Sequence, residues 1–222
     1  MHILFQDSSL VVVNKPAGLS VLPDGWEKDA PYLFQQLEQE TGKLWVVHRL
    51  DKVTSGVMLF ARSAEAHRLL NIQFEHRQTS KVYHAIITGM PPWEEHTARH
   101  PLRINVGHTH RTMVDPHRGK ASETLFRVLE RYEGYCLIEA HPATGRTHQI
   151  RVHAFALGYP LLGDTLYSAP PTDLIGRPAL HAYSLEITHP ETNERLVFSV
   201  DYPDDFRMAL EAVRARKVPT SS

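Results

Sequence analysis

The sequence predicts an α+β fold in which a mixed, mainly antiparallel sheet is flanked by helices. Short β-branched and apolar runs outnumber helical patterns, and most neighbouring runs are separated by only a few turn residues. Hydrophobic residues make up 42% of the 222 residues, which is ordinary for a globular core. Because no stretch has the composition of a linker, we expect one domain over residues 1–222, with 216–222 as a frayed tail.

Apolar periodicity, caps and turn residues place the elements along the chain. In the first part we expect strands at 10–14, 57–60 and 82–88, and a helix after the N-cap Ser63. Pro16 fixes its own φ and extends Lys15, so the first strand should end at a stiff corner. In the later part we expect mainly loops with room for one short strand at 91–120, followed by paired strands at 121–131 and 135–140. A helix should run from Thr144 to about Leu157, and a hairpin should pair 180–188 with 195–200. The last helix should be capped by Asp204 and end near Ala215.

Charge and cysteine content narrow the classes of function. The net charge is −1, which is not the basic balance typical of a nucleic-acid-binding protein. Between Arg103 and Lys120, however, four basic side chains stand against the single acidic residue Asp115, so a local basic surface is compatible with this balance. Cys136 is the only cysteine, which excludes an intramolecular disulfide. No apolar run approaches the roughly 18 residues that span a bilayer, and the N-terminus lacks signal-peptide features, so we expect a cytoplasmic protein.

The first candidate site is His48-Arg49-Leu50-Asp51, followed by Thr54-Ser55-Gly56 and an apolar strand. Polar side chains crowded at a turn before a buried strand can hold a carboxylate at the floor of a cleft. The alternative is a surface turn with an Arg–Asp pair that contributes little stability. The pattern alone favours this alternative.

The second candidate is the segment from Thr144 to His153, with two arginines and two histidines. On the expected helix, Thr147, Arg151 and Phe155 would share one face. So many basic groups are costly to bury unless they meet anions. A solvated helix face is an equally good interpretation, and a phosphate loop is less well supported because its glycine and lysine pattern does not occur.

The third candidate is Tyr83, on a strand where Tyr83, Ala85 and Ile87 face one way and the intervening residues face the other. A tyrosine on a sheet is usually part of the core. Its ring could instead stack on a nucleic-acid base.

A metal site has one candidate, His108-x-His110 with His117. No His-Glu-x-x-His pattern or cysteine pair completes a ligand set, so we predict no functional metal. The patterns for an acyl-transfer serine and for dinucleotide binding are also absent from the sequence.

Five linked motifs resemble the RluA-type family of RNA pseudouridine synthases, in the same order and over nearly the whole chain. They are Val13-Asn14-Lys15-Pro16-x-Gly18, His48-Arg49-Leu50-Asp51-x-x-Thr54-Ser55-Gly56, Lys81-x-Tyr83-x-Ala85, Thr144-Gly145-Arg146-x-His148-Gln149-x-Arg151-x-His153, and Gly158-x-Pro160-x-x-Gly163-Asp164. Together they are far more specific than any one of them, and they overturn the plainer interpretations.

The resemblance implies that Asp51 is the catalytic aspartate, that Tyr83 packs on the target base, and that Arg151 is the partner of Asp51. It implies the pseudouridine synthase fold with a central active-site cleft. It also implies a reaction without cofactor or metal. Because the strand that carries the first motif begins near residue 10, we expect a compact member without the small N-terminal RNA-binding domain of many relatives. The sequence leaves open whether Asp51 attacks the sugar, attacks the base or removes a ribose proton.

The expected partner is a stem-loop of ribosomal or transfer RNA, because unpaired loops are what sequence-specific RNA readers prefer. Arg49 could fill the gap left by a flipped base, and phosphates could be clamped by Arg103, His110, Arg111 and Lys120. We expect a monomer, although no sequence feature sets the oligomeric state. Two rival functions are a non-catalytic RNA-binding module and a nucleoside or glycoside hydrolase that uses Asp51, which would need a second carboxylate.

Overall fold

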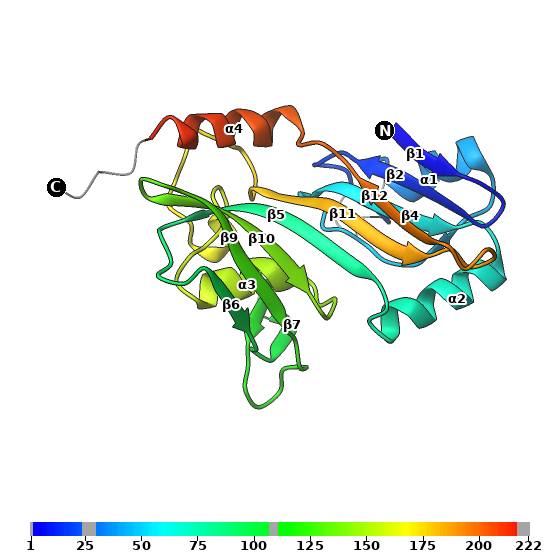
Figure 1. Ribbon diagram of the computed structural model, residues 1–222, viewed down its shortest axis with the longest axis horizontal. Helices are drawn as coiled ribbons and strands as arrows, with labels where there is room; N and C mark the ends of the chain where they lie inside the picture. Colours follow the sequence, from blue (N-terminus) through cyan, green and yellow to red (C-terminus); the bar gives the residue numbers. More distant parts are fainter. Residues whose placement is uncertain (1, 24–29, 107–110, 217–222) are drawn as a thin grey trace. The chain divides into compact units, whose positions relative to one another are not determined.

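The computed structural model describes residues 2–23, 30–106 and 111–216 and divides the chain into two compact units. The first unit holds residues 1–81 and 182–201, and the second holds residues 82–181 and 202–222. The chain passes from one to the other within strands β5 (Ser80–Thr88) and β11 (Leu180–Thr188), and again after Asp201 (Figure 1). Mainly antiparallel strands and four α-helices in the described residues confirm the α+β class.

The first unit is built on strands in the order β1-β2-β4-β11-β12, with β3 beside β4. Its further elements are β1 (His2–Gln6), β2 (Leu10–Lys15), α1 (Leu33–Thr41), β3 (Trp45–Val46), β4 (Ser55–Ala61), α2 (Ala64–Glu75) and β12 (Arg195–Ser199). The pairings β1–β2, β2–β4, β3–β4 and β11–β12 are antiparallel. The predicted strands at 10–14 and 57–60 and the 180–188 hairpin are thereby confirmed.

Both faces of β4 are covered, which explains why all seven of its residues are buried. On one face Val57 and Leu59 pack with Leu70 of α2 in a common hydrophobic cluster. On the other face the ring of Phe60 lies 6.2 Å from that of Phe34 in α1. The Ser63 hydroxyl accepts the Ala66 N–H at 3.0 Å, so the predicted N-cap of α2 is confirmed.

The second unit is built on strands in the order β5-β10-β9-β6, with β7 and β8 as a separate pair. Its further elements are β6 (Glu95–Ala98), β7 (Leu102–Val106), β8 (Arg111–Val114), β9 (Thr124–Tyr132), β10 (Tyr135–Pro142), α3 (Gln149–Ala156), the 3-10 helix η1 (Thr165–Tyr167) and α4 (Asp204–Arg214). The predicted pairing of β9 with β10 across Gly134 is confirmed by the Tyr132–Tyr135 register.

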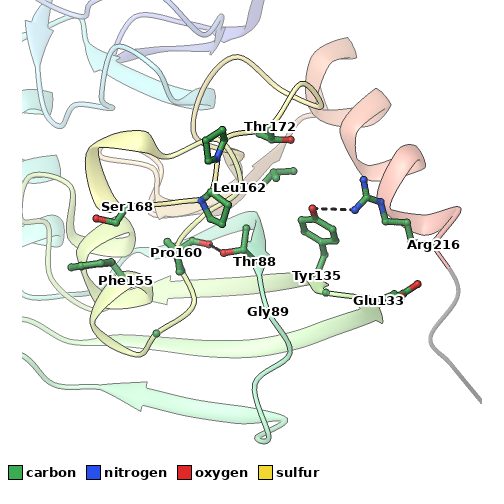
Figure 2. A pocket seen from close by; sticks show the side chains of 14 residues that line it. Thr88, Gly89, Glu133, Tyr135, Phe155, Pro160, Leu162, Ser168, Thr172 and Arg216 are labelled. Carbon is green, nitrogen blue, oxygen red and sulfur yellow. Dashed lines mark hydrogen bonds between the residues drawn. The ribbon is translucent and has the colours of Figure 1, made fainter. Parts of the chain in front are cut away.

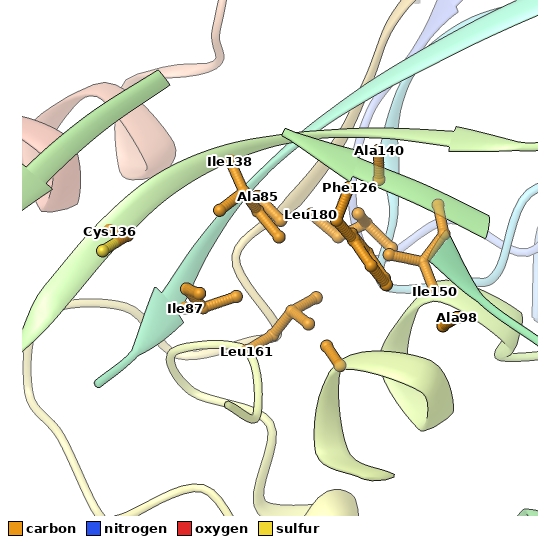
Figure 3. Close-up of a cluster of buried hydrophobic side chains, with 11 residues drawn as sticks. Ala85, Ile87, Ala98, Phe126, Cys136, Ile138, Ala140, Ile150, Leu161 and Leu180 are labelled. Carbon is orange, nitrogen blue, oxygen red and sulfur yellow. The ribbon is translucent and has the colours of Figure 1, made fainter. Parts of the chain in front are cut away.

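A helix covers each face of this sheet. Ile150 and Ala154 of α3 join Ala85, Ile87 and other side chains of β5, β9 and β10 in one cluster (Figure 3). Ile86, on the opposite face of β5, packs with residues of α4 in a second cluster. The alternation predicted for β5 is therefore confirmed, and it leaves Tyr83 on the face that packs against α3.

The prediction of mainly loops at 91–120 is wrong, because this stretch forms β6, β7 and β8. Each strand has only four or five residues, too few for a clear alternation of side chains. Contacts distant in sequence stabilise them. Leu102 of β7 packs with Val152 and Tyr167, while β6 pairs with β9.

Two helix starts also differ from the prediction. α3 begins at Gln149 rather than Thr144, because His148 has a φ of 55° and Thr147 lies in a turn before the helix. The N-cap of α4 is Pro203, not Asp204. The Asp204 carboxylate instead accepts a hydrogen bond from Arg207 at 2.7 Å.

The predicted frayed tail lies mostly outside the described residues, since 217–222 are not among them. Of the predicted tail, the structure describes Arg216. Its guanidinium lies over the Tyr135 ring at 4.9 Å and donates to the Tyr135 hydroxyl. Among the described helices, none is long and apolar enough to cross a membrane.

Candidate active site

Asp51 lies in the first unit, on the loop between β3 and β4. Its side chain is half-buried, between the exposed Arg49 and the buried Thr54. The Thr54 N–H donates to the Asp51 carbonyl at 3.0 Å and closes a tight main-chain turn that begins at Asp51. The loop thus presents Asp51 from a fixed main chain.

The buried Lys15 connects this loop by hydrogen bonds to the first of the five motifs, Val13-Asn14-Lys15-Pro16-x-Gly18. The Lys52 carbonyl accepts hydrogen bonds from the Lys15 ammonium at 3.2 Å and from the Gly18 N–H at 2.8 Å. Lys15 also donates to the carbonyls of Pro16 and Leu19, at 2.8 and 2.7 Å. The predicted corner after β2 therefore supports the residue next to Asp51.

Gly56 is required where the loop enters β4. Its φ is +120°, and a Cβ atom there would overlap the backbone carbonyl of Ala182 in β11. Only glycine accepts both conditions. This close approach fixes the point at which the loop that carries Asp51 ends.

His48 is a neutral structural residue of the same loop. Its Nε2 accepts the Leu59 N–H at 3.1 Å, and its ring stacks on Phe74 with centroids 4.9 Å apart. Burial lowers the pKa of the imidazole to about 3, and the charge of Lys81 acts in the same direction. His48 is therefore unsuited to donate a proton near neutral pH.

Arg151 lies in the second unit on α3, and only 5% of its surface is exposed. Its Nε and Nη2 donate to the two carboxylate oxygens of Asp164 at 2.7 and 2.8 Å. The guanidinium also lies over the Tyr167 ring, 5.1 Å from its centroid. A bidentate pair of this kind holds a buried guanidinium in one orientation.

Sequence reasoning gave no role to Asp164 or Tyr167. Asp164 stood in the fifth motif, and the signal that points to it is chemical, because a buried arginine requires an acidic partner. Tyr167 had no signal in the sequence. Its contact with Arg151 depends on how η1 folds back on α3.

The segment before α3 is held by one glutamine. The Gln149 carbonyl oxygen accepts the Thr144 hydroxyl at 2.7 Å and the Arg146 N–H at 3.0 Å, while its amide donates to the Glu123 carbonyl and the Thr124 hydroxyl. The Arg146 Nε is buried and has no hydrogen-bond partner in the structure. Hydrogen bonds thus hold the segment before α3 in place, while the Arg146 Nε donates no hydrogen bond in the structure.

The predicted phosphate-binding residues belong to the second unit. Arg111 and Lys120 are exposed, whereas Arg103 is half-buried and lies 3.3 Å from Asp115. His110 and the metal candidate His108 lie outside the described residues. Across the ranges that the structure covers, no group of three His, Cys, Asp or Glu side chains could hold a metal ion.

Known proteins are similar to this chain over most of its length. The family model described as RNA pseudouridylate synthase matches residues 9–156. The uncharacterized RNA pseudouridine synthase YhcT of Bacillus subtilis is 37% identical over 214 residues, which cover 93% of this chain and 70% of that protein. The dual-specificity RNA pseudouridine synthase RluA of Haemophilus influenzae is 37% identical over 201 residues, which cover 90% of this chain and 92% of that protein.

A solved structure agrees with these relatives. Human RNA pseudouridylate synthase domain containing 4 has a TM-score of 0.78 at 27% identity, over 96% of this chain and 93% of that chain. The chain belongs to the RluA-type family of RNA pseudouridine synthases. This synthase is an RNA-modifying isomerase, as the resemblance predicted.

The second unit of the synthase also contains a cavity of about 940 Å³ (Figure 2). Its walls include Thr88 at the end of β5, Tyr135 at the start of β10, Phe155 of α3 and Arg216. Of the described residues that line the cavity, none belongs to the predicted site. The cavity therefore has no assigned part in the isomerisation.

Proposed function

We propose that Asp51 is the catalytic carboxylate that isomerises uridine to pseudouridine in a loop of ribosomal or transfer RNA. The observation that carries the proposal is the construction of the Asp51 loop, where a fully buried lysine and a glycine hydrogen bond fix the backbone beside a half-exposed carboxylate. A surface turn with an incidental Arg–Asp pair has no need of such support.

The isomerisation of uridine to pseudouridine requires one ionised carboxylate. The bond from ribose to the base nitrogen breaks and a bond to carbon 5 of the same base forms, so no atoms are gained or lost overall. The proposal leaves three routes open for Asp51, which are addition to the sugar, addition to the base, and removal of a ribose proton. In each route the carboxylate must be charged near neutral pH.

The same proposal gives Arg151 the role of cationic partner to Asp51. A guanidinium beside a carboxylate favours its ionised form and orients it. Support for this role comes from the family resemblance and from the burial of Arg151.

Tyr83 is proposed to stack on the extruded uracil, and Arg49 to fill the gap that the base leaves. Flipping a base costs a few kcal/mol, and stacking on an aromatic ring recovers about 1–3 kcal/mol. Tyr83 is half-buried and packs against the hydrophobic cluster of the second unit, so the proposal requires that the base reach the part of the residue that is not covered.

Phosphate contacts are proposed for Arg103, His110, Arg111 and Lys120. Arg146 is a further candidate, because an RNA phosphate oxygen would satisfy its buried Nε. A relative named for the large ribosomal subunit supports ribosomal RNA as a substrate class, and a relative named for dual specificity supports more than one RNA substrate. We further propose that residues 1–222 act as one monomeric catalytic domain, without metal, in the cytoplasm where these RNAs occur.

The test is release of tritium from RNA labelled at carbon 5 of uracil, since isomerisation replaces that hydrogen. Asp51→Asn should bind RNA with unchanged affinity but release no tritium, whereas Asp201→Asn, an exposed carboxylate of the same unit, should match the wild type. Substantial turnover by Asp51→Asn would remove Asp51 from the mechanism. Free uracil among the wild-type products would indicate a hydrolase instead.

A further inference from the structure

The buried Arg151 guanidinium is held on two sides by residues that the proposed mechanism does not use. Asp164 accepts two hydrogen bonds along one edge of the guanidinium, and the Tyr167 ring lies against its face. Asp164 is 1% exposed and Tyr167 is 2% exposed. Both come from the short segment that folds back on α3, so the arginine is enclosed from outside its own helix.

The Tyr167 hydroxyl connects this arrangement to β8. It accepts the Thr112 N–H at 3.1 Å and donates to the Thr112 carbonyl at 3.1 Å. His148 Nδ1 lies 3.0 Å from the same oxygen. A phenol has one proton and two lone pairs, so with its proton directed to Thr112, His148 Nδ1 must be the donor. One oxygen thus joins β8, η1 and the N-terminal end of α3.

We propose that Asp164 and Tyr167 are positioning residues for Arg151, and that the Tyr167 hydroxyl ties its orientation to the β7–β8 hairpin. The inference rests on the proposed role of Arg151 in the isomerisation. It adds a route by which RNA contacts made by Arg111 on β8 influence the rate of the chemical step. Neither residue touches substrate in this scheme.

Charge gives the arrangement a second consequence. Asp164 offsets the charge of Arg151, so the buried pair is close to neutral and acts on a further carboxylate chiefly through directed hydrogen bonds. If Asp164 became neutral, Arg151 would keep its full charge. A carboxylate in contact with Arg151 would then ionise at lower pH, by about one pH unit or more.

The hydroxyl is tested with Tyr167→Phe, which keeps the ring under the guanidinium. The single-turnover rate of tritium release should fall about tenfold, because the hairpin no longer fixes the ring, while RNA affinity changes less than about twofold. Tyr159→Phe is the matched control. Tyr159 packs edge-on against Trp93 in the same unit and should keep the wild-type rate. A wild-type rate in Tyr167→Phe would overturn the positioning role of the hydroxyl.

The charge is tested with Asp164→Asn and Asp164→Glu. The acidic limb of the pH–rate profile should move to lower pH in Asp164→Asn and stay in place in Asp164→Glu, whereas a purely structural role would lower the folded fraction and leave the limb unmoved. An unmoved limb in folded Asp164→Asn overturns the role of Asp164. If Asp164→Asn does not fold, Tyr167→Phe decides the proposal. Full activity in Arg151→Ala would refute the proposed function of Arg151, a result distinct from failure of the positioning role alone.

Discussion

Lys15 is fully buried, and its ammonium group donates to three main-chain carbonyls, one of which belongs to the residue after Asp51. In Lys15→Met the side chain keeps its length, but the carbonyls of Pro16 and Leu19 lose this donor, while the Lys52 carbonyl still accepts the Gly18 N–H. Each buried group left unsatisfied costs about 1–3 kcal/mol, and we expect a total loss of about 3 kcal/mol in the free energy of unfolding. Urea denaturation at neutral pH measures it. The exposed Lys120→Met should change stability by less than about 0.5 kcal/mol, and equal stabilities of the two variants would contradict the assigned role.

His153 is a buried histidine that must stay neutral. Burial lowers the pKa of its imidazole to about 4, from a usual value near 6.5. Its Nδ1 lies 3.0 Å from the Thr124 hydroxyl and its Nε2 lies 3.2 Å from the His100 carbonyl, which fits a ring protonated on Nε2 alone.

This histidine predicts acid sensitivity. Between pH 6.5 and about 4 the unfolded chain binds a proton that the folded chain excludes, so stability present above pH 6.5 is lost as pH falls. The loss from this group approaches roughly 3 kcal/mol below pH 4. Urea unfolding measured at several pH values should show a flatter dependence in His153→Gln. The exposed His76→Gln should follow the wild type, and a wild-type pH slope in His153→Gln would refute the assignment.

Some residues of the site could be predicted from the sequence and others could not. The motifs indicated Asp51, Tyr83 and Arg151, because their residue types and order are specific to a family. Burial of Lys15 was not predictable, since lysine is rarely buried and its three acceptors are main-chain groups that any sequence offers. The pairing of Arg151 with Asp164 was also missed, because the two residues are thirteen positions apart and a turn lies between them.

At the scale of an element, β5 places Tyr83 through simple alternation. Tyr83, Ala85 and Ile87 share the face that packs against α3, while His84 lies on the other face, its Nδ1 2.6 Å from the Tyr202 hydroxyl. Tyr83→Ala should lower the single-turnover rate about tenfold to a hundredfold, because the ring contributes about 1–3 kcal/mol by stacking on a base. Tyr83→Phe keeps the ring and should retain most of that rate. An unchanged rate in Tyr83→Ala would exclude stacking.

Most of the long strands were predictable, whereas the short strands and the nine-residue helix α1 were not. Strands of six to nine residues, such as β2, β4 and β10, carry enough alternation or apolar content to be recognised. β8 has four residues, and its Thr112 backbone is satisfied by a tyrosine 55 positions away. The start of α3 was placed five residues early because the positive φ of His148 has no clear sequence signal.

At the scale of the whole molecule, the chain forms two units that are each discontinuous in sequence. Residues 182–201 return to the first unit after one hundred residues in the second, and no linker composition marks either passage. Asp51 belongs to the first unit, and Tyr83 and Arg151 belong to the second. The order of the motifs predicted the family, but the division into units depends on strand pairings that are distant in sequence.

A nearly neutral protein that binds RNA must concentrate its positive charge locally, so the salt dependence of binding is the measurement that locates the phosphate contacts. Each lost contact should lower the slope of log affinity against log salt concentration by about 0.7–0.9. Arg111→Gln and Lys120→Gln should each show this loss, because both side chains are exposed. Arg103→Gln should show a smaller loss of slope, since Asp115 already offsets its charge.

The control Arg195→Gln, which breaks a pair with Glu186 in the first unit, should leave the slope unchanged. An unaltered slope in Arg111→Gln and Lys120→Gln would exclude the segment from phosphate contact, and a full loss in Arg103→Gln would show that RNA displaces Asp115.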